Sequence, residues 1–308
     1  MSNILRSDPA VIARAEAAYL GLALGDALGA TVEFMTPREI RAAFANKGGI
    51  HREIIGGGWL HLKPGQVTDD TTMSLALGAA IINDRGAVSP MSCARAFDDW
   101  MRSKPIDIGN TVRRNLVSFR KTGNPCAPLS EHDAGNGAAM RVLPVALATF
   151  GLDESAVKKA VRAQAHVTHH NPASDAACDC LVFMVQDALR GACLRDLYLQ
   201  RIAPFVSAYG EFIFRPRRRD NPSGWVVETM QAVLQGLLDN GSFEESLIDV
   251  VNRGGDADTT GAITGMLAGA LYGRSVLPKH WLKQLDPKVA EACRTQARTL
   301  LELAGRER

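Results

Sequence analysis

The chain has 308 residues, of which 46% are hydrophobic, 22% are charged and only 6% are aromatic. This is the composition of an ordinary globular protein, and it excludes a disordered chain, a collagen-like repeat and a coiled-coil rod. Lysine and arginine together number 35 against 33 acidic residues, a net charge of +2, so a dedicated nucleic-acid-binding protein is not expected.

Helical patterns dominate the chain from its start. Ser7 or Asp8 can cap a first helix that has Pro9 in its first turn. Further helices are predicted over residues 73–83, 91–101, 109–121, 137–150, 154–165, 174–190, 225–238, 243–251, 260–272 and 288–304. Short strands are conceivable only at 51–55 or 212–214. We therefore predict an all-α fold, a single compact multi-helix domain over residues 1–308 with a loose tail at about residues 1–10.

The start of the chain also predicts where the protein resides. Arg6 is the only candidate for a charged leader, and Glu16 and Asp26 interrupt the apolar stretch that follows it. The apolar run at 17–25 is far shorter than the roughly 20 residues of a membrane helix. The cysteines are scattered without a CxxC pair, which is typical of free thiols in a reducing compartment. We expect a cytoplasmic protein.

Two helices carry unusual faces. The stripe of the first helix includes Asp26 and Glu33, and a buried carboxylate needs a cation or strong donors nearby. A later helix places Gly261, Gly265 and Gly269 on one face, which predicts close packing of two helix backbones. The alternative, a membrane dimer motif, does not fit so short a segment with polar flanks.

Two short acidic clusters each stand ahead of a predicted helix, at residues 68–72 (TDDTT) and 254–260 (GGDADTT). Capping alone would explain one such cluster, but a helix needs one acceptor and each cluster offers several. If the clusters meet in space, their carboxylates must take up protons or bind cations. An all-oxygen donor set suits Mg²⁺ or Mn²⁺, and this many acids can serve two ions. The candidate ligands are Thr68, Asp69, Asp70, Asp256, Asp258 and Thr259, with Glu33 as a further candidate.

Several long motifs resemble those of the ADP-ribosylglycohydrolases, in the expected order. The opening motif covers residues 21–34 (GLALGDALGATVEF), and the two acidic clusters are similar to the metal motifs of the family. Trp59 after three glycines, residues 105–111 (PIDIGNT) and residues 133–141 (DAGNGAAMR) also match. The resemblance runs from about residue 15 to the C-terminus, and it is closest to the bacterial dinitrogenase reductase-activating branch.

The resemblance implies an all-α fold with a central cleft that holds a dinuclear Mn²⁺ (or Mg²⁺) centre, with the six candidate residues as ligands. It implies hydrolysis of the N-glycosidic bond between ADP-ribose and a protein arginine, which in the bacterial branch belongs to the nitrogenase iron protein. It further implies a PII-type signalling protein and an ammonium channel as partners, with reversible recruitment to the inner membrane.

The resemblance also implies roles for other residues. Asp107 would act as general acid or base, its alternative being a cap ahead of Gly109, and Glu33 would order the water or the ribose, its alternative being a structural role. Substrate contacts are implied for Gly109, Asn110, Glu131, Gly135, Asn136, Gly137, His169 and Trp225. Within this set the loop 131–137 would cradle the pyrophosphate or be a plain turn. Trp225 would stack on adenine where the branch often has tyrosine, or belong to the core.

Two basic features have competing interpretations. His166, His169 and His170 fall on one helical face and suggest zinc, but no HExxH or cysteine partner supports that site, so ordinary polar histidines are favoured. The basic run at 215–219 (RPRRR) is predicted to be a solvated loop, and the alternative is a contact with an acidic protein surface or with phosphates.

Two rival functions remain open. A binding or structural protein on the same fold is one, although crowded carboxylates serve no purpose in such a protein. A hydrolase of other ADP-ribose linkages, such as those to serine, is the other, because metal motifs do not discriminate the leaving group. The length of the match favours the arginine-specific branch.

Overall fold

Helix starts follow the capping residues of the sequence. In the computed structural model, which describes residues 7–304, helix α2 (Pro9–Gly29) begins behind Asp8, whose carboxylate accepts a hydrogen bond from the Ala10 amide at 2.8 Å. Helix α3 (Pro37–Ala43) begins with a capping box formed by Thr36 and Glu39. The other α-helices are α4 (Asp69–Asn83), α5 (Pro90–Arg102), α6 (Asn110–Thr122), α7 (Leu143–Ala148), α8 (Glu154–Ala165), α9 (Pro172–Leu189), α10 (Leu194–Leu197), α11 (Ala203–Ala208), α12 (Val226–Asp239), α13 (Phe243–Val251), α14 (Ala257–Tyr272), α15 (Lys279–Gln284) and α16 (Pro287–Leu303).

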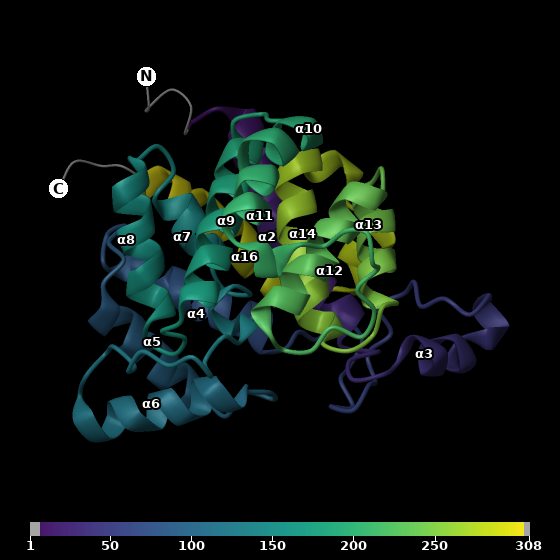
Figure 1. Cartoon of the computed structure of the whole chain (residues 1–308), viewed down its shortest axis with the longest axis horizontal. Coiled ribbons are helices and arrows are strands. Elements are labelled where there is room, and N and C mark those ends of the chain that lie inside the picture. The colour runs from purple at the N-terminus through teal and green to yellow at the C-terminus, as the bar shows by residue number, and fades with distance from the viewer. Residues whose placement is uncertain (1–6, 305–308) are drawn as a thin grey trace.

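Helices α2 and α14 lie side by side at the centre of the fold (Figure 1). Their backbones touch: a Cβ atom on Gly25 would lie 2.0 Å from the Gly261 carbonyl oxygen, and one on Gly265 would lie 2.0 Å from that of Gly21. The glycine stripe therefore serves close packing, as predicted. The helices run antiparallel, since the C-terminal end of α2 at Gly29 meets the N-terminal end of α14 at Ala257.

Other helices pack around this central pair. Helices α4, α9, α12, α13 and α16 contact α2 or α14, and their buried faces join one continuous hydrophobic core. Helices α5, α6 and α8 lie on one side of the pair, and α3 lies on the opposite side (Figure 1). The antiparallel arrangement brings the segment after α2 to the start of α14, where the second acidic cluster lies.

The all-α prediction is confirmed, and most predicted helices are found within a few residues of their expected bounds. The prediction of one helix over 137–150 is wrong. A 3₁₀ turn (Asn136–Ala138) is followed by a break, and α7 begins anew with Pro144 in its first turn, because proline cannot continue the preceding helix. The short helices α3, α10, α11 and α15 were not predicted.

Neither strand candidate forms a strand. Among the described residues the extended pairing is limited to the isolated bridges Gly57–Leu62 and Gly135–Trp225. The predicted loose tail falls partly on residues 1–6, which lie outside the described residues, whereas Pro9 and Ala10 already belong to α2.

The predictions about the cysteines and about membrane helices can also be compared with the structure. All six cysteines are free thiols. Across residues 7–304, no helix has both the length and the apolar content that crossing a bilayer requires.

Candidate active site

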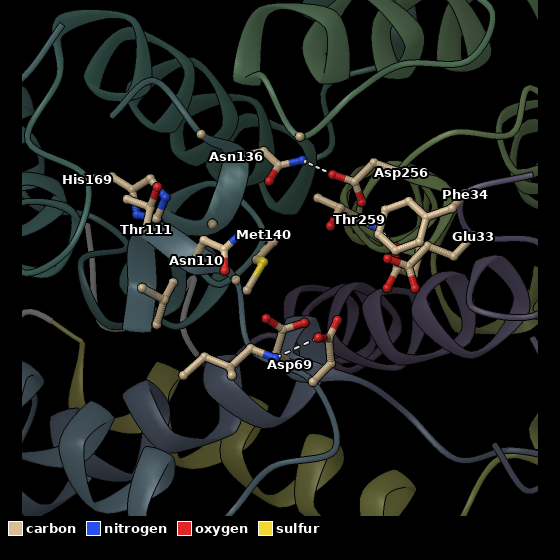
Figure 2. Close-up of a pocket in the computed structure, with 18 of the residues that line it drawn as sticks. Glu33, Phe34, Asp69, Asn110, Thr111, Asn136, Met140, His169, Asp256 and Thr259 are labelled. Carbon is tan, nitrogen blue, oxygen red and sulfur yellow. Dashed lines mark hydrogen bonds between the residues drawn. The ribbon is translucent and has the colours of Figure 1, made fainter. Parts of the chain in front are cut away.

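A cavity of about 440 Å³ lies between the N-terminal ends of α4, α6 and α14 (Figure 2). The assigned residues that line it are Glu33, Asp69, Asp107, Gly109, Asn110, Gly135, Asn136, Gly137, His169, Asp256, Asp258 and Thr259. Thr68 and Asp70 are buried directly behind this lining. Glu131 and Trp225 are not part of the lining, although Gly224 beside Trp225 is.

The two acidic clusters meet at this cavity. The Thr68 hydroxyl lies 3.3 Å from Asp258 Oδ2, and the Thr259 hydroxyl lies 3.3 Å from Asp70 Oδ2. Asp69 and Asp70 occupy the first turn of α4 rather than the residues ahead of it, and Asp258 likewise lies inside α14. Neither N-cap residue of these helices makes a side-chain capping hydrogen bond, so capping does not account for the clusters.

A buried carboxylate of α2 holds the first cluster in place. Asp26 accepts hydrogen bonds from the amides of Thr68 (2.9 Å) and Thr71 (3.1 Å) and from their hydroxyls (3.0 and 2.5 Å). Burial raises the pKa of Asp26 to about 6, against the lowering effect of these donors. Asp26 was noted in the sequence as an anomalous acid but not assigned to the site, and its signal was its place on an apolar stripe.

Glu33 reaches the cavity from the segment after α2. Its Oε2 accepts a hydrogen bond from Trp59 Nε1 at 2.6 Å, and the Trp59 ring packs 5.4 Å from that of Phe34 at the cavity mouth. A carboxylate oxygen of Glu33 lies within 4.8 Å of those of Asp256 and Asp258. Glu33 therefore belongs to the same carboxylate cluster as the second acidic motif.

The cluster carries more negative charge than its protein surroundings neutralise. Burial, followed by the charges of neighbouring acids, raises the pKa of Asp69 to about 8 and the pKa values of Asp70 and Asp258 well above the usual range. Asp70 Oδ1 is buried without a hydrogen-bond partner. An orphaned carboxylate oxygen in an all-oxygen cluster matches the donor chemistry of a hard divalent cation.

Asp107 stands at the boundary of the carboxylate cluster, on the segment that leads into α6. Its Oδ1 accepts a hydrogen bond from the Ile108 amide at 2.7 Å, and Asp107 lines the cavity close enough to Asp69 for its charge to raise the pKa of Asp69. Burial raises the pKa of Asp107, and the charge of Asp256 adds to that effect. A half-buried acid with a raised pKa is suited to proton transfer.

The loop 131–137 is held by its neighbours. Asn136 donates a backbone hydrogen bond to the Gly224 carbonyl at 3.0 Å, and its Nδ2 donates to Asp256 Oδ2 at 2.7 Å. The Asn136 side chain thus orients Asp256, as Figure 2 shows, and its amide N–H is already occupied. Gly135 and Gly137 also line the cavity. Trp225 is 46% exposed, so it is not a core residue.

His169 is the histidine of its run that lines the cavity, and a chain of hydrogen bonds reaches its ring from behind. Arg141 Nη2 donates to the Thr168 hydroxyl at 2.8 Å, and that hydroxyl lies 2.8 Å from His169 Nδ1. With Arg141 occupying one lone pair of the Thr168 hydroxyl, the hydroxyl hydrogen can be donated to Nδ1, and in a neutral imidazole this direction corresponds to the ring proton on Nε2. Burial, and then the charge of Arg141, lowers the pKa of His169 to about 3.

The cavity therefore has two unlike sides (Figure 2). The acidic wall consists of Glu33, Asp69, Asp256, Asp258 and Thr259 at the cavity surface, with Thr68 and Asp70 buried behind them, and it is held by α2, α4 and α14. The donor wall consists of Asn110, Gly135, Gly137 and His169, held by α6, the loop 131–137 and the segment between α8 and α9. A cavity with these two walls suits an elongated ligand. One end of the ligand would contact cations held by the acidic wall, and the other end would accept hydrogen bonds from the donor wall.

None of the residues of the basic run 215–219 lines the cavity. Arg215 pairs with Asp239, Arg218 with Asp220 and Asp249, and Arg219 with Glu228. These intramolecular ion pairs are typical of a solvated loop.

The chain is similar to known proteins in both sequence and structure. A sequence model of the ADP-ribosylglycohydrolase family matches residues 7–308. The ADP-ribosyl-[dinitrogen reductase] glycohydrolase of Rhodospirillum rubrum is 48% identical over 297 residues, which cover 96% of this chain and 98% of that protein. The ADP-ribosylarginine hydrolase Tri1 of Serratia proteamaculans (strain 568) is 30% identical over 293 residues, covering 88% and 75%. A solved structure described as an ADP-ribosylglycohydrolase-related protein complex matches with a TM-score of 0.83 and 32% identity, covering 96% of this chain and 99% of that one.

Proposed function

Because the chain belongs to the ADP-ribosylglycohydrolase family, we propose that it is a hydrolase that removes ADP-ribose from an arginine side chain of a target protein. The target that we propose is the nitrogenase iron protein, since the Rhodospirillum rubrum relative named for that substrate is similar over nearly its whole length. The structural observation that carries the proposal is the meeting of both acidic clusters with Asp107 in one cavity.

The proposed cofactor is a pair of divalent cations, Mn²⁺ or Mg²⁺. The ligands would be Thr68, Asp69, Asp70, Asp256, Asp258 and Thr259, whose oxygens are clustered and short of positive partners, and all of which are buried except the half-buried Asp256. Such ions, when bound, neutralise these carboxylates and polarise the oxygens of ribose and water. The protein supports them with Asp26 behind the first cluster and Asn136 behind Asp256.

Asp107 is the proposed general base and acid. The arginine leaves ribose C1 as a neutral guanidine while an oxocarbenium-like charge develops on the sugar, which the neighbouring carboxylates stabilise. Asp107 then takes a proton from the attacking water as its oxygen bonds to C1, and passes the proton to the departing guanidine. Glu33, fixed by Trp59, orders the water or the ribose.

The donor wall is proposed to hold the rest of ADP-ribose. The amides of Gly135 and Gly137 and the Nε2–H of neutral His169 can donate to the pyrophosphate oxygens, with Gly109 and Asn110 at the start of α6 beside them. Trp225, half-exposed next to Gly224, presents a ring face for adenine. Glu131, outside the lining, would contact substrate only at the rim.

Wider features of the biology are also proposals for this chain. We propose that it acts as a single domain in the cytoplasm. Control by a PII-type signalling protein and recruitment to an ammonium channel at the inner membrane are proposed from the resemblance to the bacterial branch.

The decisive experiment offers the purified protein two substrates in parallel, an ADP-ribosylated arginine protein and an ADP-ribosylated serine peptide, in the presence of Mn²⁺. We expect release of ADP-ribose from the first substrate alone, and loss of that release after treatment with EDTA. Release from the serine peptide alone would assign a different linkage. Asp107→Asn should abolish turnover while ADP-ribose still binds, whereas wild-type rates in that variant would place the proton transfer elsewhere.

A further inference from the structure

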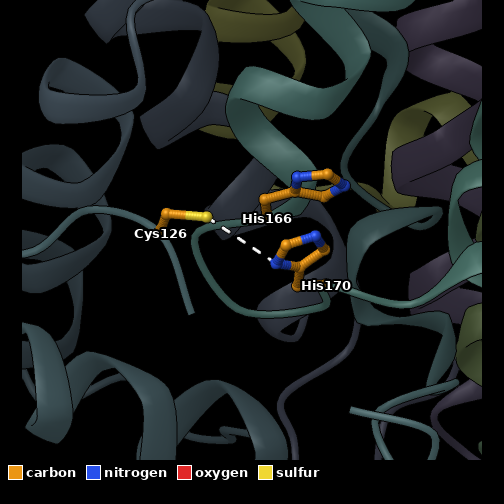
Figure 3. A group of neighbouring side chains, drawn as sticks. All are labelled: Cys126, His166 and His170. Atoms are coloured by element: carbon orange, nitrogen blue, oxygen red, sulfur yellow. Dashed lines mark hydrogen bonds between the residues drawn. The ribbon is translucent and has the colours of Figure 1, made fainter. Parts of the chain in front are cut away.

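Three side chains with nitrogen and sulfur ligand atoms converge on the face of the molecule where α8 ends (Figure 3). Cys126 comes from the loop after α6, and His166 and His170 lie within the segment between α8 and α9. One ligand atom from each residue lies within 4.8 Å of the others, and Cys126 Sγ is 3.7 Å from His170 Nδ1. The sequence offered no cysteine partner for these histidines, because Cys126 is far away along the chain.

Each imidazole is already oriented by one hydrogen bond. His166 Nε2 lies 3.0 Å from both oxygens of Asp175, and His170 Nδ1 lies 2.8 Å from the Ala127 carbonyl oxygen. Metal-binding histidines typically donate one ring N–H to a carboxylate or a carbonyl, which leaves the second nitrogen as the ligand. His166 has that arrangement, which leaves its Nδ1 as the ligand atom. The Nδ1 of His170 faces both the Ala127 carbonyl oxygen and Cys126 Sγ, so a bound ion would replace the contact with Ala127. All three side chains are partly accessible to solvent.

We propose that Cys126, His166 and His170 form a second cation site, for Zn²⁺ or a similar borderline ion, separate from the acidic cavity. One thiolate and two imidazoles match the ligands that zinc prefers, and an open fourth position is common. Zinc–ligand distances of about 2.3 Å to sulfur and 2.0 Å to nitrogen in a tetrahedron place sulfur and nitrogen about 3.5 Å apart. The observed separation of 3.7 Å is close to this value.

Binding requires a small rearrangement of the rings. The imidazoles are stacked with centroids 3.8 Å apart and planes inclined by 21°, so their lone pairs do not yet point at one ion. Binding would therefore require rotation of the rings about their Cβ–Cγ bonds until one nitrogen of each points to a common ion. The bound ion would then tie the loop after α6 to the segment that carries His169, and would stabilise the folded state by binding it alone.

The test uses Co²⁺ as the probe, added in equimolar amount to the full-length protein in excess Mg²⁺. Thiolate ligands give Co²⁺ an intense sulfur-to-metal charge-transfer band in the near ultraviolet, which an all-oxygen site cannot give. We expect this band in the wild type, its loss when Zn²⁺ is added, and its absence in Cys126→Ser. The exposed Cys193 supplies the matched control, and Cys193→Ser should keep the band.

Further variants separate the ligands from their supports. Asp175→Asn should weaken Co²⁺ and Zn²⁺ binding about 10- to 100-fold without removing the band, because Asp175 orients His166 rather than binding the ion. His170→Ala should abolish the band. A wild-type protein without the band, or a band that persists in Cys126→Ser, would overturn the proposal. Thermal unfolding provides a second readout, since Zn²⁺ should raise the melting temperature of the wild type more than that of Cys126→Ser.

Discussion

The acidic wall and the donor wall of the cavity are built in different ways. The acidic wall belongs to helices whose backbones touch, with Gly25 and Gly261 leaving no room for a side chain between α2 and α14. The donor wall belongs to loops that are fixed by side-chain hydrogen bonds, such as those from Arg141 to Thr168 and from Asn136 to Thr229. Clustered carboxylates repel one another, so they stay close together only if the surrounding backbone is held rigidly. Neutral hydrogen-bond donors do not repel one another, so they need only to be oriented.

The largest expected effect comes from breaking the frame of the acidic wall. A Cβ atom added by Gly25→Ala would lie 2.0 Å from the Gly261 oxygen, and neither backbone can move without separating α2 from α14. We expect a loss of at least about 4 kcal/mol in the free energy of unfolding, measured by urea denaturation.

The control for this substitution is Gly241→Ala, in a loop where an added Cβ meets nothing within 4 Å. This variant should remain within about 0.5 kcal/mol of the wild type. Equal stability of the two variants would contradict backbone contact between the central helices.

The next effect tests whether the acidic wall is built for cations. In EDTA, Asp70→Asn should be more stable than the wild type, since it removes a buried charge that has no positive partner. Mn²⁺ at about 100 times its Kd should stabilise the wild type by about 3 kcal/mol and the variant much less.

Asp98 is the matched control for Asp70, because it is also buried but pairs with Arg102 and Arg120. Asp98→Asn should lower the free energy of unfolding in EDTA and keep the response to Mn²⁺. Destabilisation of metal-free protein by Asp70→Asn would show that the carboxylates are satisfied without ions. Thermal unfolding with and without Mn²⁺ measures both effects.

The two walls also differ in how well the sequence predicts them. The acidic wall can be predicted from the sequence because most of its residues are contiguous in two clusters. The glycine spacing of α14 also predicts close helix packing, which is the contact between α2 and α14. The donor wall cannot be predicted in this way, since the hydrogen-bond partners around His169 and Asn136 come from distant segments of the chain. The break before Pro144 is hidden for another reason: the residues around it are mostly good helix formers, and proline is compatible both with a broken helix and with the first turn of a new one.

A pH effect of intermediate size tests the neutrality of the donor wall. The pKa of His169 is about 3 in the folded protein, and the ordinary value near 6.5 applies in the unfolded chain. The unfolded state therefore binds more protons between these values, so the stability that His169 contributes is present above pH 6.5 and is lost as the pH falls toward 3. Between pH 7 and 4.5 in EDTA, the wild type should lose about 2 to 3 kcal/mol more than His169→Gln. Equal losses in urea denaturation at the two pH values would show that His169 is not held neutral by the fold.

The smallest expected effect isolates the hydrogen bond between the Thr168 hydroxyl and His169 Nδ1. Thr168→Val removes the hydroxyl between Arg141 Nη2 and His169 Nδ1 and leaves two buried polar groups without that partner, which costs about 1 to 3 kcal/mol of stability. If the role of Thr168 is purely structural, this loss of stability is the only effect of the substitution. If the hydroxyl also places the proton on Nε2, the ring nitrogen chemical shifts of His169 must change toward the other tautomer, and kcat/KM must fall more than the loss of folded protein explains. Thr168→Ser keeps the hydroxyl and should restore both the tautomer and the rate, so a serine variant that behaves like valine would show that the methyl group, and not the hydrogen bond, is what the donor wall requires.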